Sequence, residues 1–494
     1  MDEPATDLAS VVSDCVHCGF CLPACPTYQL WGEEMDSPRG RIHLIGQVVD
    51  GAPLSAAAVE HFDRCLGCMA CMPACPSGVR YNVLIEAARA WTDDTGPAPG
   101  AAVSEPGTAG AGGLAAGTPE PGAVSSATGG APPDQRAPRP GPVRSRRERA
   151  FRAAIFATFP YPRRLRALTG PLRLSQRAGL DRWLTRGRAA RWLPPEFAAA
   201  LRVAPRPGPR APALPGRIPA RGQRRAVVGM LTGCVQDVFF SEVNRATARV
   251  LAAEGCDVII PARQGCCGAL SLHSGRATEA AGFARRAITE FEQAGVDTIV
   301  INSAGCGSAM KEYGALLGGG HGGPADGGSG DSGDGWAARA AEFSGKVRDL
   351  SEFLAELYEQ HGGPRATRHE LAITAVYHDA CHLAHAQRIR QQPRDLLRGI
   401  PGMTVAEVAD GGACCGSAGV YNLLQPKAAV ELGQRKAAAI RATEGRLVVS
   451  ANPGCSLQIG AALAADGGAP LQVVHLAQVL DASLRGLPVS SLTS

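Results

Sequence analysis

The stretch CVHCGFCLPACP, residues 15–26, places four cysteines at the spacing C-x2-C-x2-C-x3-C and ends in proline. The same spacing and the same final proline return in CLGCMACMPACP, residues 65–76. Three cysteines two residues apart can wrap three corners of an iron–sulfur cubane, but the fourth cannot reach the same cubane without strain. The fourth cysteine of each run therefore ligates the cluster that the other run holds, which explains why the run occurs twice.

The two runs predict a helical domain over residues 1–92 that holds two [4Fe–4S] clusters. Zinc is the alternative, but zinc sites usually need only two CxxC pairs, and eight cysteines in this order leave no natural division into zinc sites. Pro26 and Pro76 redirect the chain after each fourth cysteine. We assign one cluster to Cys15, Cys18, Cys21 and Cys75, and the other to Cys65, Cys68, Cys71 and Cys25. Such clusters move single electrons, and we predict no catalytic residue in this chain.

The segment SPRGRIHLI, residues 37–45, joins the two runs. Arg39 and Arg41 could offset the charge of the clusters or contact a partner. The alternative is an ordinary helix start with solvated arginines.

The composition indicates a soluble protein of a reducing compartment. The 494 residues have a mean hydropathy of −0.04, and no run of about 18 apolar residues occurs. The acidic start MDEPATDLASVV lacks the pattern of a secretory signal, so we expect a cytoplasmic protein. In that compartment the 17 cysteines are more often metal ligands or redox groups than disulfides.

Two different segments follow the first domain. Residues 93–144 are rich in Gly, Ala, Pro, Ser and Thr without hydrophobic periodicity, which predicts a disordered linker. Residues 145–222 form a basic, helical and Pro-rich connector in our interpretation. Residues 136–225 hold 23 Arg, no Lys and three acids. Within them, Phe151, Ile155, Phe156 and Phe159 share one predicted helix face, and Leu180, Trp183, Leu184 and Trp192 lie among arginines. The connector could contact an anionic membrane surface, dock a partner or simply be solvated.

The second half contains an internal repeat of cysteines. A single cysteine is followed about 32 residues later by CCG, and about 39 residues further on by a last cysteine. The spacings of the two copies agree within one residue. The first copy comprises Cys234, Cys266, Cys267 and Cys306, and the second comprises Cys381, Cys414, Cys415 and Cys455.

Buried strands and helical runs alternate around these cysteines, which predicts parallel α/β layers. Strands are expected at AVVGML, DVIIP and DTIVI in the first copy, and at LAITAVYH, TVAEV and LVVS in the second. Helices are expected at SEVNRATARVLAAEG and ATEAAGFARRAITEFEQAG. We place the repeats at residues 223–345 and 346–494, with a flexible loop at 318–335. Each repeat should gather its cysteines at the carboxyl ends of its strands.

Four thiols in each repeat suffice for an additional iron–sulfur centre, and buried inert cysteines are the alternative. His273, His378, His382 and His385 lie near these cysteines in the sequence. They could supply a ligand or a proton relay, but we favour a structural role. Asp379 is expected to end a strand or to cap the next helix. The glycine matches GGGHGG and GSGDSG neither follow a strand nor open a helix, so no flavin or nucleotide site is indicated.

The order of these parts resembles the iron–sulfur subunit of bacterial glycolate oxidase. Shared motifs include SPRGRIHLI, QGCCGALSLH, YHDACHLAHAQ, CCGSAGVYNLLQP and NPGCSLQI. Lactate-utilisation proteins, anaerobic glycerol-3-phosphate dehydrogenase subunits and heterodisulfide reductase subunits have the same layout. The heterodisulfide reductase pattern ends each repeat in CxxC, whereas Ser303 and Asn452 occupy the first of those positions here. This departure weakens the inference of a thiol/disulfide oxidoreductase.

The resemblance implies an α+β multidomain protein that transfers electrons within an oxidoreductase complex. A separate FAD-containing subunit would oxidise glycolate or another 2-hydroxy acid, and this chain would pass the electrons to a quinone or another acceptor. The chain could then lie peripherally on the inner face of the cell membrane. A nucleic-acid-binding redox sensor is a third hypothesis. The arginines are dispersed among prolines and no helix-turn-helix is evident, so no nucleic acid is expected.

Overall fold

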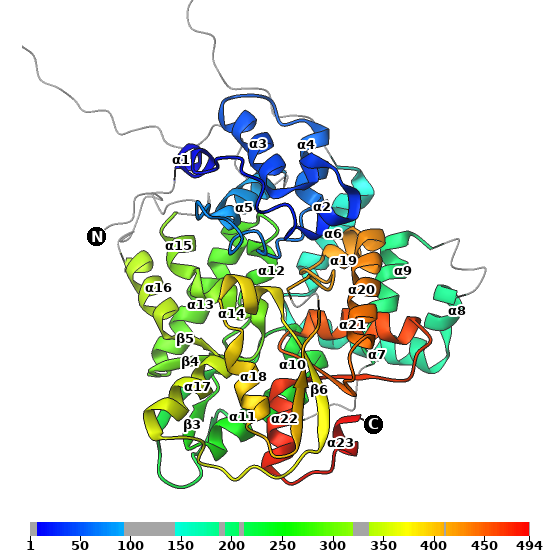
Figure 1. The fold of residues 1–494 in the computed structure, drawn as a ribbon. Helices are drawn as coiled ribbons and strands as arrows, with labels where there is room; N and C mark the ends of the chain where they lie inside the picture. The colour runs from blue at the N-terminus through cyan, green and yellow to red at the C-terminus, as the bar shows by residue number, and fades with distance from the viewer. Residues whose placement is uncertain are drawn as a thin grey trace, which may run out of the picture.

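A computed structural model describes residues 7–92, 144–186, 193–206, 212–319, 335–409 and 412–493. The amino-terminal domain sits on top of the paired repeats, and the connector runs along one side of them (Figure 1). The linker predicted at 93–144 lies outside the described residues apart from Arg144. The loop predicted at 318–335 lies outside them over residues 320–334.

The amino-terminal domain is helical, as predicted. Its core packs Ile45, Phe62, Leu84 and Ile85 with no exposed surface. Each cysteine run forms a loop between two helices, and Pro26 begins the helix after the first run, where a missing N–H costs nothing. The helices are α1 (Leu8–Ser13), α2 (Pro26–Trp31), the 3₁₀ turn η1 (Glu34–Asp36), α3 (Pro38–Val49), α4 (Ala56–Arg64) and α5 (Tyr81–Thr92).

The described part of the connector is a set of helices: α6 (Arg146–Thr158), α7 (Pro162–Arg177), α8 (Leu180–Arg186) and α9 (Pro195–Val203). The predicted apolar face of α6 is confirmed, because Ile155 and Phe156 are buried and Ile155 packs against Leu423 of the second repeat. Arg144 and Arg152 both pair with Asp63 of α4, at 2.8 and 3.2 Å. The connector thus joins the amino-terminal domain to the second repeat. Trp192 lies outside the described residues.

The first repeat is a parallel sheet with one antiparallel edge strand, in the order β1-β3-β2-β4-β5. The strands expected before Cys234, before CCG and before Cys306 are all present. Its strands are β1 (Arg217–Ile218), β2 (Ala226–Met230), β3 (Cys256–Ile259), β4 (Thr298–Ile301) and β5 (Val347–Asp349). Its helices are α10 (Val235–Phe239), α11 (Ser241–Ala253), α12 (Ala269–Leu272), α13 (Ala277–Gln293), α14 (Ala304–Lys311), α15 (Tyr313–Leu317), α16 (Gly335–Lys346) and α17 (Leu350–His361).

The second sheet, in the order β7-β6-β8-β9, repeats the parallel part of the first, β3-β2-β4-β5, and all of its pairs are parallel. The strands are β6 (Ile373–His378), β7 (Met403–Ala406), β8 (Leu447–Ser450) and β9 (Gln472–His475). The helices are the π-helical turn η3 (His382–Ala386), α18 (Gln391–Arg398), α19 (Tyr421–Leu424), α20 (Pro426–Arg441), α21 (Pro453–Ala465), α22 (Leu476–Leu484) and α23 (Ser490–Thr493). Because β5 pairs with β4, the first sheet extends beyond residue 345, where we place the end of the first repeat from the sequence.

The two repeats share one hydrophobic core and face each other at the carboxyl ends of β4 and β8. Helices α11 and α22 pack together, and Arg249 pairs with Asp481 at 2.7 Å. The backbone N–H of Ala304 donates to the carbonyl of Ala451 at 3.0 Å. Ligand sites of open α/β sheets lie at these strand ends. The pairing therefore brings the sites of both repeats to one place.

Candidate iron–sulfur centres and the cavity between them

Four buried cysteines gather at the inner side of the amino-terminal domain. Cys25 lines one small cavity together with Cys65, Cys68 and Cys71, although it belongs to the first run. The structure thus brings Cys25 to the cysteines of the second run, the group to which the sequence assigns it. Burial raises the pKa of Cys68 and Cys71 well above the ordinary value of a thiol. A metal would compensate the charge of these ligands once they are deprotonated.

Cationic and polar groups surround Cys65 in this set. Burial favours its neutral thiol, but the charges of Arg41 and Arg89 outweigh burial and lower the pKa of Cys65. The backbone N–H of Gly67 donates to its Sγ at 3.3 Å, and the hydroxyl of Tyr81 lies 3.5 Å from that sulfur. Hydrogen bonds and positive charge favour a thiolate, so these groups suit a ligand of a metal cluster.

The other set of the amino-terminal domain lies nearer the surface. Cys18 is exposed, whereas Cys15, Cys21 and Cys75 are half-buried and pack against the domain core. The loop also exposes the apolar side chains of Val16 and Phe20 by 68% and 66%.

Both cysteine loops turn through left-handed backbone at matching positions. His17 and Gly67 have φ of 53° and 63°, and Gly19 and Met69 have φ of 85° and 59°. Each loop thus places one residue with a side chain in a region that usually favours glycine. These turns let closely spaced cysteines share one face, which a regular helix or strand would not allow.

The four thiols of the first repeat form a continuous group at the end of its sheet. The sulfurs of Cys234 and Cys266 are 3.6 Å apart, and Cys267 contacts both Cys266 and Cys306. Contact with the neighbouring thiol is the main influence that raises the pKa of Cys266 and of Cys306, and burial adds to it. Cys306 lies in the first turn of α14, where the helix dipole favours a thiolate.

The thiols of the second repeat make the same sequence of contacts, from Cys381 through Cys414 and Cys415 to Cys455. All four are buried. Cys381 and Cys414 also pack in one hydrophobic cluster with Cys68 of the amino-terminal domain. The second repeat is therefore in direct contact with the buried cysteine set of that domain.

A cavity of about 490 Å³ lies between the repeats and is lined by all eight of these cysteines. Its lining also includes Leu66 from the second cysteine loop and Leu165, Leu168 and Leu172 from α7. The volume is in the range of roughly 300–1,000 Å³ that small-molecule sites occupy. The lining therefore combines candidate metal-ligating thiols with apolar leucine side chains.

The donor sets fit iron–sulfur centres. Buried thiols that contact one another would stay protonated on their own, and a metal cation both deprotonates them and compensates their charge. Backbone N–H groups already point at sulfur in each repeat, from Gly268 to Cys266 at 3.4 Å and from Gly416 to Cys414 at 3.5 Å. Hydrogen bonds to the sulfurs are among the features that set the potential of such clusters.

The histidines near the cysteines have different environments. His273 Nδ1 lies 2.8 Å from the carboxylate of Glu86 in α5, and its ring lies 4.8 Å from that of His382. His385 Nε2 donates to the carbonyl of Gly412 at 2.9 Å. These contacts agree with the structural role that we favour for His273 and His385. His378 lies at the end of β6, next to Cys415 and Cys455.

Asp379 directly follows β6, as expected of a residue that ends a strand. It does not cap the next helix. Its carboxylate instead accepts two hydrogen bonds from the guanidinium of Arg394, at 2.9 and 2.8 Å. The solvated role considered for Arg41 is also wrong. Its side chain is fully buried and donates to the carbonyl of His61 at 2.7 Å.

The structure adds residues that the cysteine spacing could not indicate. Tyr81 contacts Cys65, and Tyr313 donates a hydrogen bond of 2.6 Å to the carbonyl of Cys267. Arg89 of α5 donates to the carbonyl of His273 at 2.6 Å and so joins the amino-terminal domain to the first repeat. The remaining cysteine, Cys256, is the first residue of β3 and packs in the shared core, apart from the other sixteen.

The fold and its cysteine sets define a two-cluster ferredoxin-type protein with a pair of cysteine-rich α/β repeats. Family comparisons agree: residues 11–79 match the 4Fe-4S dicluster domain, and residues 228–311 and 375–460 match the cysteine-rich domain. Residues 147–204 match the linker region of the glycolate oxidase iron-sulfur subunit.

The probable glycolate oxidase iron-sulfur subunit of Bacillus subtilis (strain 168) is 33% identical over 474 residues, which cover 94% of this chain and 93% of that protein. The glycolate oxidase iron-sulfur subunit of Escherichia coli (strain K12) is 31% identical over 465 residues, or 93% and 92% of the two chains. Lactate utilization protein A of Exiguobacterium sp. (strain ATCC BAA-1283 / AT1b) is 28% identical over 258 residues, which cover 52% of this chain and 98% of that protein. The chain belongs to the family of glycolate oxidase iron–sulfur subunits.

Proposed function

We propose that this chain is the electron-transfer subunit of a flavin-dependent 2-hydroxy-acid dehydrogenase, with glycolate as the first candidate substrate. In this role a separate FAD-containing subunit oxidises the hydroxy acid to the oxo acid and releases two electrons one at a time. The observation that carries the proposal is the continuity of the cysteine sets. They lead from the exposed loop at Cys18, through the buried set at Cys68, to Cys381 and the shared cavity.

Iron–sulfur clusters supply the one-electron chemistry of this path. Cys15, Cys18, Cys21 and Cys75 would hold the outer cluster, and Cys65, Cys68, Cys71 and Cys25 would hold the inner one. The cysteines of each repeat would hold a further centre. The protein's own part is to exclude water from the inner set and to place Cys68 against Cys381.

The outer loop suits the docking of the flavoprotein subunit. Val16 and Phe20 are exposed apolar side chains beside the exposed Cys18. Aromatic side chains of this kind are enriched in protein interfaces. Docking here would bring the flavin close to the outer cluster, which is the most accessible cysteine set of the chain.

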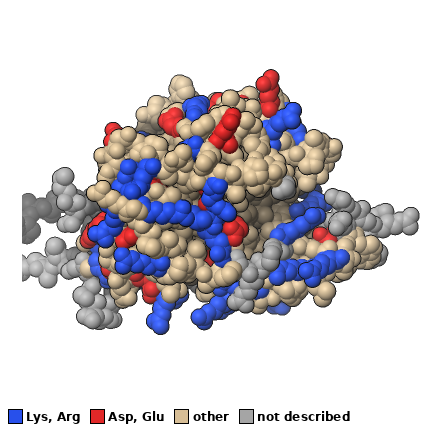
Figure 2. Space-filling model, turned by 90° about the horizontal axis from the view of Figure 1, so that it is seen from below, with Lys and Arg blue, Asp and Glu red and all other residues tan. Residues whose placement is uncertain are grey.

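A quinone is the candidate acceptor, and α7 supports this proposal. Leu168 lines the cavity and is also 52% exposed, so the cavity borders the surface there. Arg163, Arg164 and Arg166 are exposed on the same helix. Figure 2 shows Lys and Arg side chains crossing the face seen from below, with a row at the side where Figure 1 places α7 to α9.

These features suit peripheral contact with an anionic membrane, because cations attract lipid headgroups while Leu168, Leu174 and Trp183 can insert. Among the described residues, none of the helices combines the length and the apolar character needed to cross a bilayer.

The relay is tested with Cys68→Ala in the complex assembled with its flavoprotein subunit. We expect the flavin to be reduced by glycolate as before, while reduction of a dye that accepts electrons beyond the inner cluster is lost. The matched control is Cys256→Ala, a buried cysteine outside both sets that should leave dye reduction unchanged. Full dye reduction by the Cys68→Ala complex would contradict the relay.

Membrane contact is tested by flotation with vesicles of zwitterionic lipid, with and without about one-third anionic lipid. We expect the protein to float only with the anionic vesicles, because each exposed Arg near the surface contributes about 1 kcal/mol. The double substitution Arg163→Gln and Arg166→Gln should reduce the bound fraction severalfold. Arg435→Gln is the control, since Arg435 is half-exposed on α20, outside the connector. Equal binding to both vesicle types would contradict an electrostatic membrane contact.

A further inference from the structure

The two repeats match in the order of their parallel strands and in cysteine spacing, but they differ three residues before the first cysteine. His378 lies three residues before Cys381, and the corresponding residue before Cys234 is Leu231. Both side chains are buried with 2% exposure. Leu231 directly follows β2, and His378 is the last residue of β6. Leu231 packs among apolar residues with Cys266 and Cys267 and offers no ligand atom. The second repeat therefore has a potential metal ligand that the first repeat lacks.

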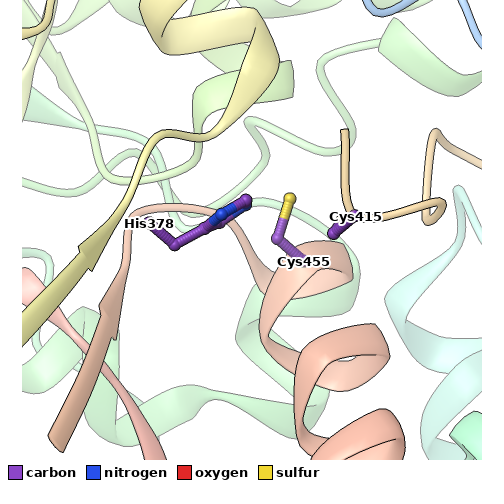
Figure 3. A group of neighbouring side chains, drawn as sticks. All are labelled: His378, Cys415 and Cys455. Carbon is purple, nitrogen blue, oxygen red and sulfur yellow. The ribbon is translucent and has the colours of Figure 1, made fainter. Parts of the chain in front are cut away.

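The ligand atoms around His378 are close enough to share one metal. One ring nitrogen of His378 and the sulfurs of Cys415 and Cys455 all lie within 4.8 Å of one another, and all three residues are buried. Figure 3 shows the imidazole directed toward Cys455, with Cys415 on the other side of that sulfur. A metal that binds sulfur at about 2.3 Å and nitrogen at about 2.0 Å fits between such atoms with small movements of the side chains.

Three different elements bring these residues together. His378 is the last residue of β6, Cys455 lies in the first turn of α21 after β8, and Cys415 belongs to the CCG loop. Strands β6 and β8 are neighbours, and the chain crosses from β7 to β8 over β6. This makes the ends of β6 and β8 a topological switch point, where open α/β sheets bind ligands.

The residue at the position of the absent CxxC thiol is engaged elsewhere. The Oδ1 atom of Asn452 accepts hydrogen bonds from Ser303 at 3.4 Å and from the N–H of Gly305 at 3.3 Å, across the contact between the repeats. Its Nδ2 atom donates to the sulfur of Cys455 at 3.5 Å. Asn452 thus supports a ligand and ties the repeats together. His378 offers this repeat a nitrogen donor beside Cys415 and Cys455.

We propose that His378 ligates the metal centre of the second repeat through its imidazole, together with Cys415 and Cys455. This inference rests on the proposed function, in which the repeats hold iron–sulfur centres. The centre of the first repeat is then bound by thiolates alone, and that of the second by thiolates and a neutral imidazole. Histidine in place of thiolate raises the potential of an iron–sulfur centre. The second repeat, which contacts Cys68, is then the more strongly oxidising of the two.

The test uses the full chain, prepared anaerobically with and without ¹⁵N-labelled histidine and examined by pulsed EPR in its paramagnetic redox states. We expect a strong nitrogen coupling that changes with the label, is lost in His378→Ala and His378→Cys, and is retained in His385→Ala. His385 is the matched control because it is a buried histidine of the same segment whose nitrogens face Gly412 and Arg390. In His378→Cys we also expect the midpoint of this centre to shift to lower potential, because an anion replaces a neutral ligand.

The comparison of labelled and unlabelled wild-type protein needs no variant, so it holds even if His378→Ala fails to fold. A coupling that persists in a folded His378 variant overturns the proposal. The proposal is also overturned if the wild-type protein shows no nitrogen coupling although Cys415→Ala lowers the iron content. In that case the second repeat holds a centre without histidine, and the relay stays intact. If Cys415→Ala leaves iron and sulfide unchanged, the second repeat holds no centre, and both the proposal and its part in the relay fail.

Discussion

Arg41 shows how a single side chain prepares the inner cluster site. Its guanidinium lies in the interior and contacts Thr27, Asp36 and the carbonyl of His61. Asp36 has no exposed surface and also pairs with His61 and Arg64, at 2.8 and 3.0 Å. A buried charge is tolerated only when it is paired and hydrogen-bonded. The network therefore places a compensated positive charge beside Cys65, where a cluster adds negative charge.

The substitution Arg41→Gln should destabilise the protein by about 3–5 kcal/mol, because it leaves the carboxylate of Asp36 buried with less compensation. It should also weaken retention of the inner cluster, since Arg41 helps to lower the pKa of Cys65. Arg39→Gln is the matched control on the same helix. Its pair with Glu34 is partly exposed, so the cost should stay within about 1 kcal/mol. Anaerobic urea unfolding measures the free energy of unfolding of both variants. An equal loss of stability in Arg41→Gln and Arg39→Gln would contradict a buried role for Arg41.

At this scale the sequence predicts ligands better than it predicts their support. The spacing of the cysteines limits which of them can share a cluster and assigns Cys25 to the second run, and the structure places Cys25 in one cavity with Cys65, Cys68 and Cys71. The sequence does not decide whether Arg41 is solvated or buried, because the segment SPRGRIHLI allows both equally well. Burial depends on Asp36 and His61, and their approach is set by the packing of α3 against α4.

At the scale of elements, the CCG loops show the same geometry twice. Gly268 and Gly416 have φ of 78° and 86°, and each donates its N–H to the first cysteine of its pair. Gly268 also lies against α13, and Gly416 lies against α20. A Cβ at Gly268 would lie 3.2 Å from the carbonyl of Ala280, and a Cβ at Gly416 would lie 2.8 Å from the carbonyl of Ala429. Glycine is therefore required both by the turn and by the close approach of α13 and α20.

Gly416→Ala should cost about 1–3 kcal/mol, and Gly268→Ala should cost less. Both substitutions force a side chain into left-handed backbone, but only a Cβ at Gly416 would come closer than 3.0 Å to a backbone atom. The two variants are compared by their free energies of unfolding in urea and by their iron contents. Gly467→Ala is a control, because Gly467 also has positive φ but a Cβ there would meet none of the described atoms within 4 Å. A larger loss in Gly467→Ala than in Gly416→Ala would contradict the packing argument.

The sequence predicts most strands of the repeats, and the reason is their burial. Strand β8, Leu447–Ser450, is buried along its whole length and stands out as a continuous apolar run before Cys455. Strands β1, β5 and β9 were not predicted. β1 has two residues, β5 consists of Val-Arg-Asp, and β9 is only half-buried apart from His475. Edge strands take their conformation from the neighbour that they pair with, so their own residues give a weak signal.

The whole molecule depends on how the two repeats face each other, and no spacing within one repeat could predict that. Their shared core and the contact of α11 with α22 place both cysteine sets around one cavity. Buried polar groups also cross this contact. His475 caps α22 by accepting from the N–H of Ala477 at 3.0 Å, and its Nε2 donates to the carbonyl of Asn302 in the first repeat at 2.9 Å.

Only neutral imidazole can accept the hydrogen bond from Ala477 at Nδ1, whereas Nε2 can donate to Asn302 in either protonation state. Protonation should therefore break the cap of α22 and place a charge in the buried contact between the repeats, so this contact should weaken in acid. Burial lowers the pKa of His475 from 6.5 to about 4. Between these values the unfolded chain binds a proton that the folded chain does not. The contribution of His475 to the free energy of unfolding is thus complete above about pH 6.5 and is lost as the pH falls toward about 4.

The test compares wild-type protein with His475→Asn. Between about pH 7.5 and about pH 5.5, the free energy of unfolding of the wild type should fall by about 1 kcal/mol more than that of the variant. Asparagine keeps an N-cap but does not titrate, so the difference isolates the imidazole. Anaerobic urea unfolding at the two pH values measures it, and parallel losses in both proteins would mean that His475 does not link the repeats to pH.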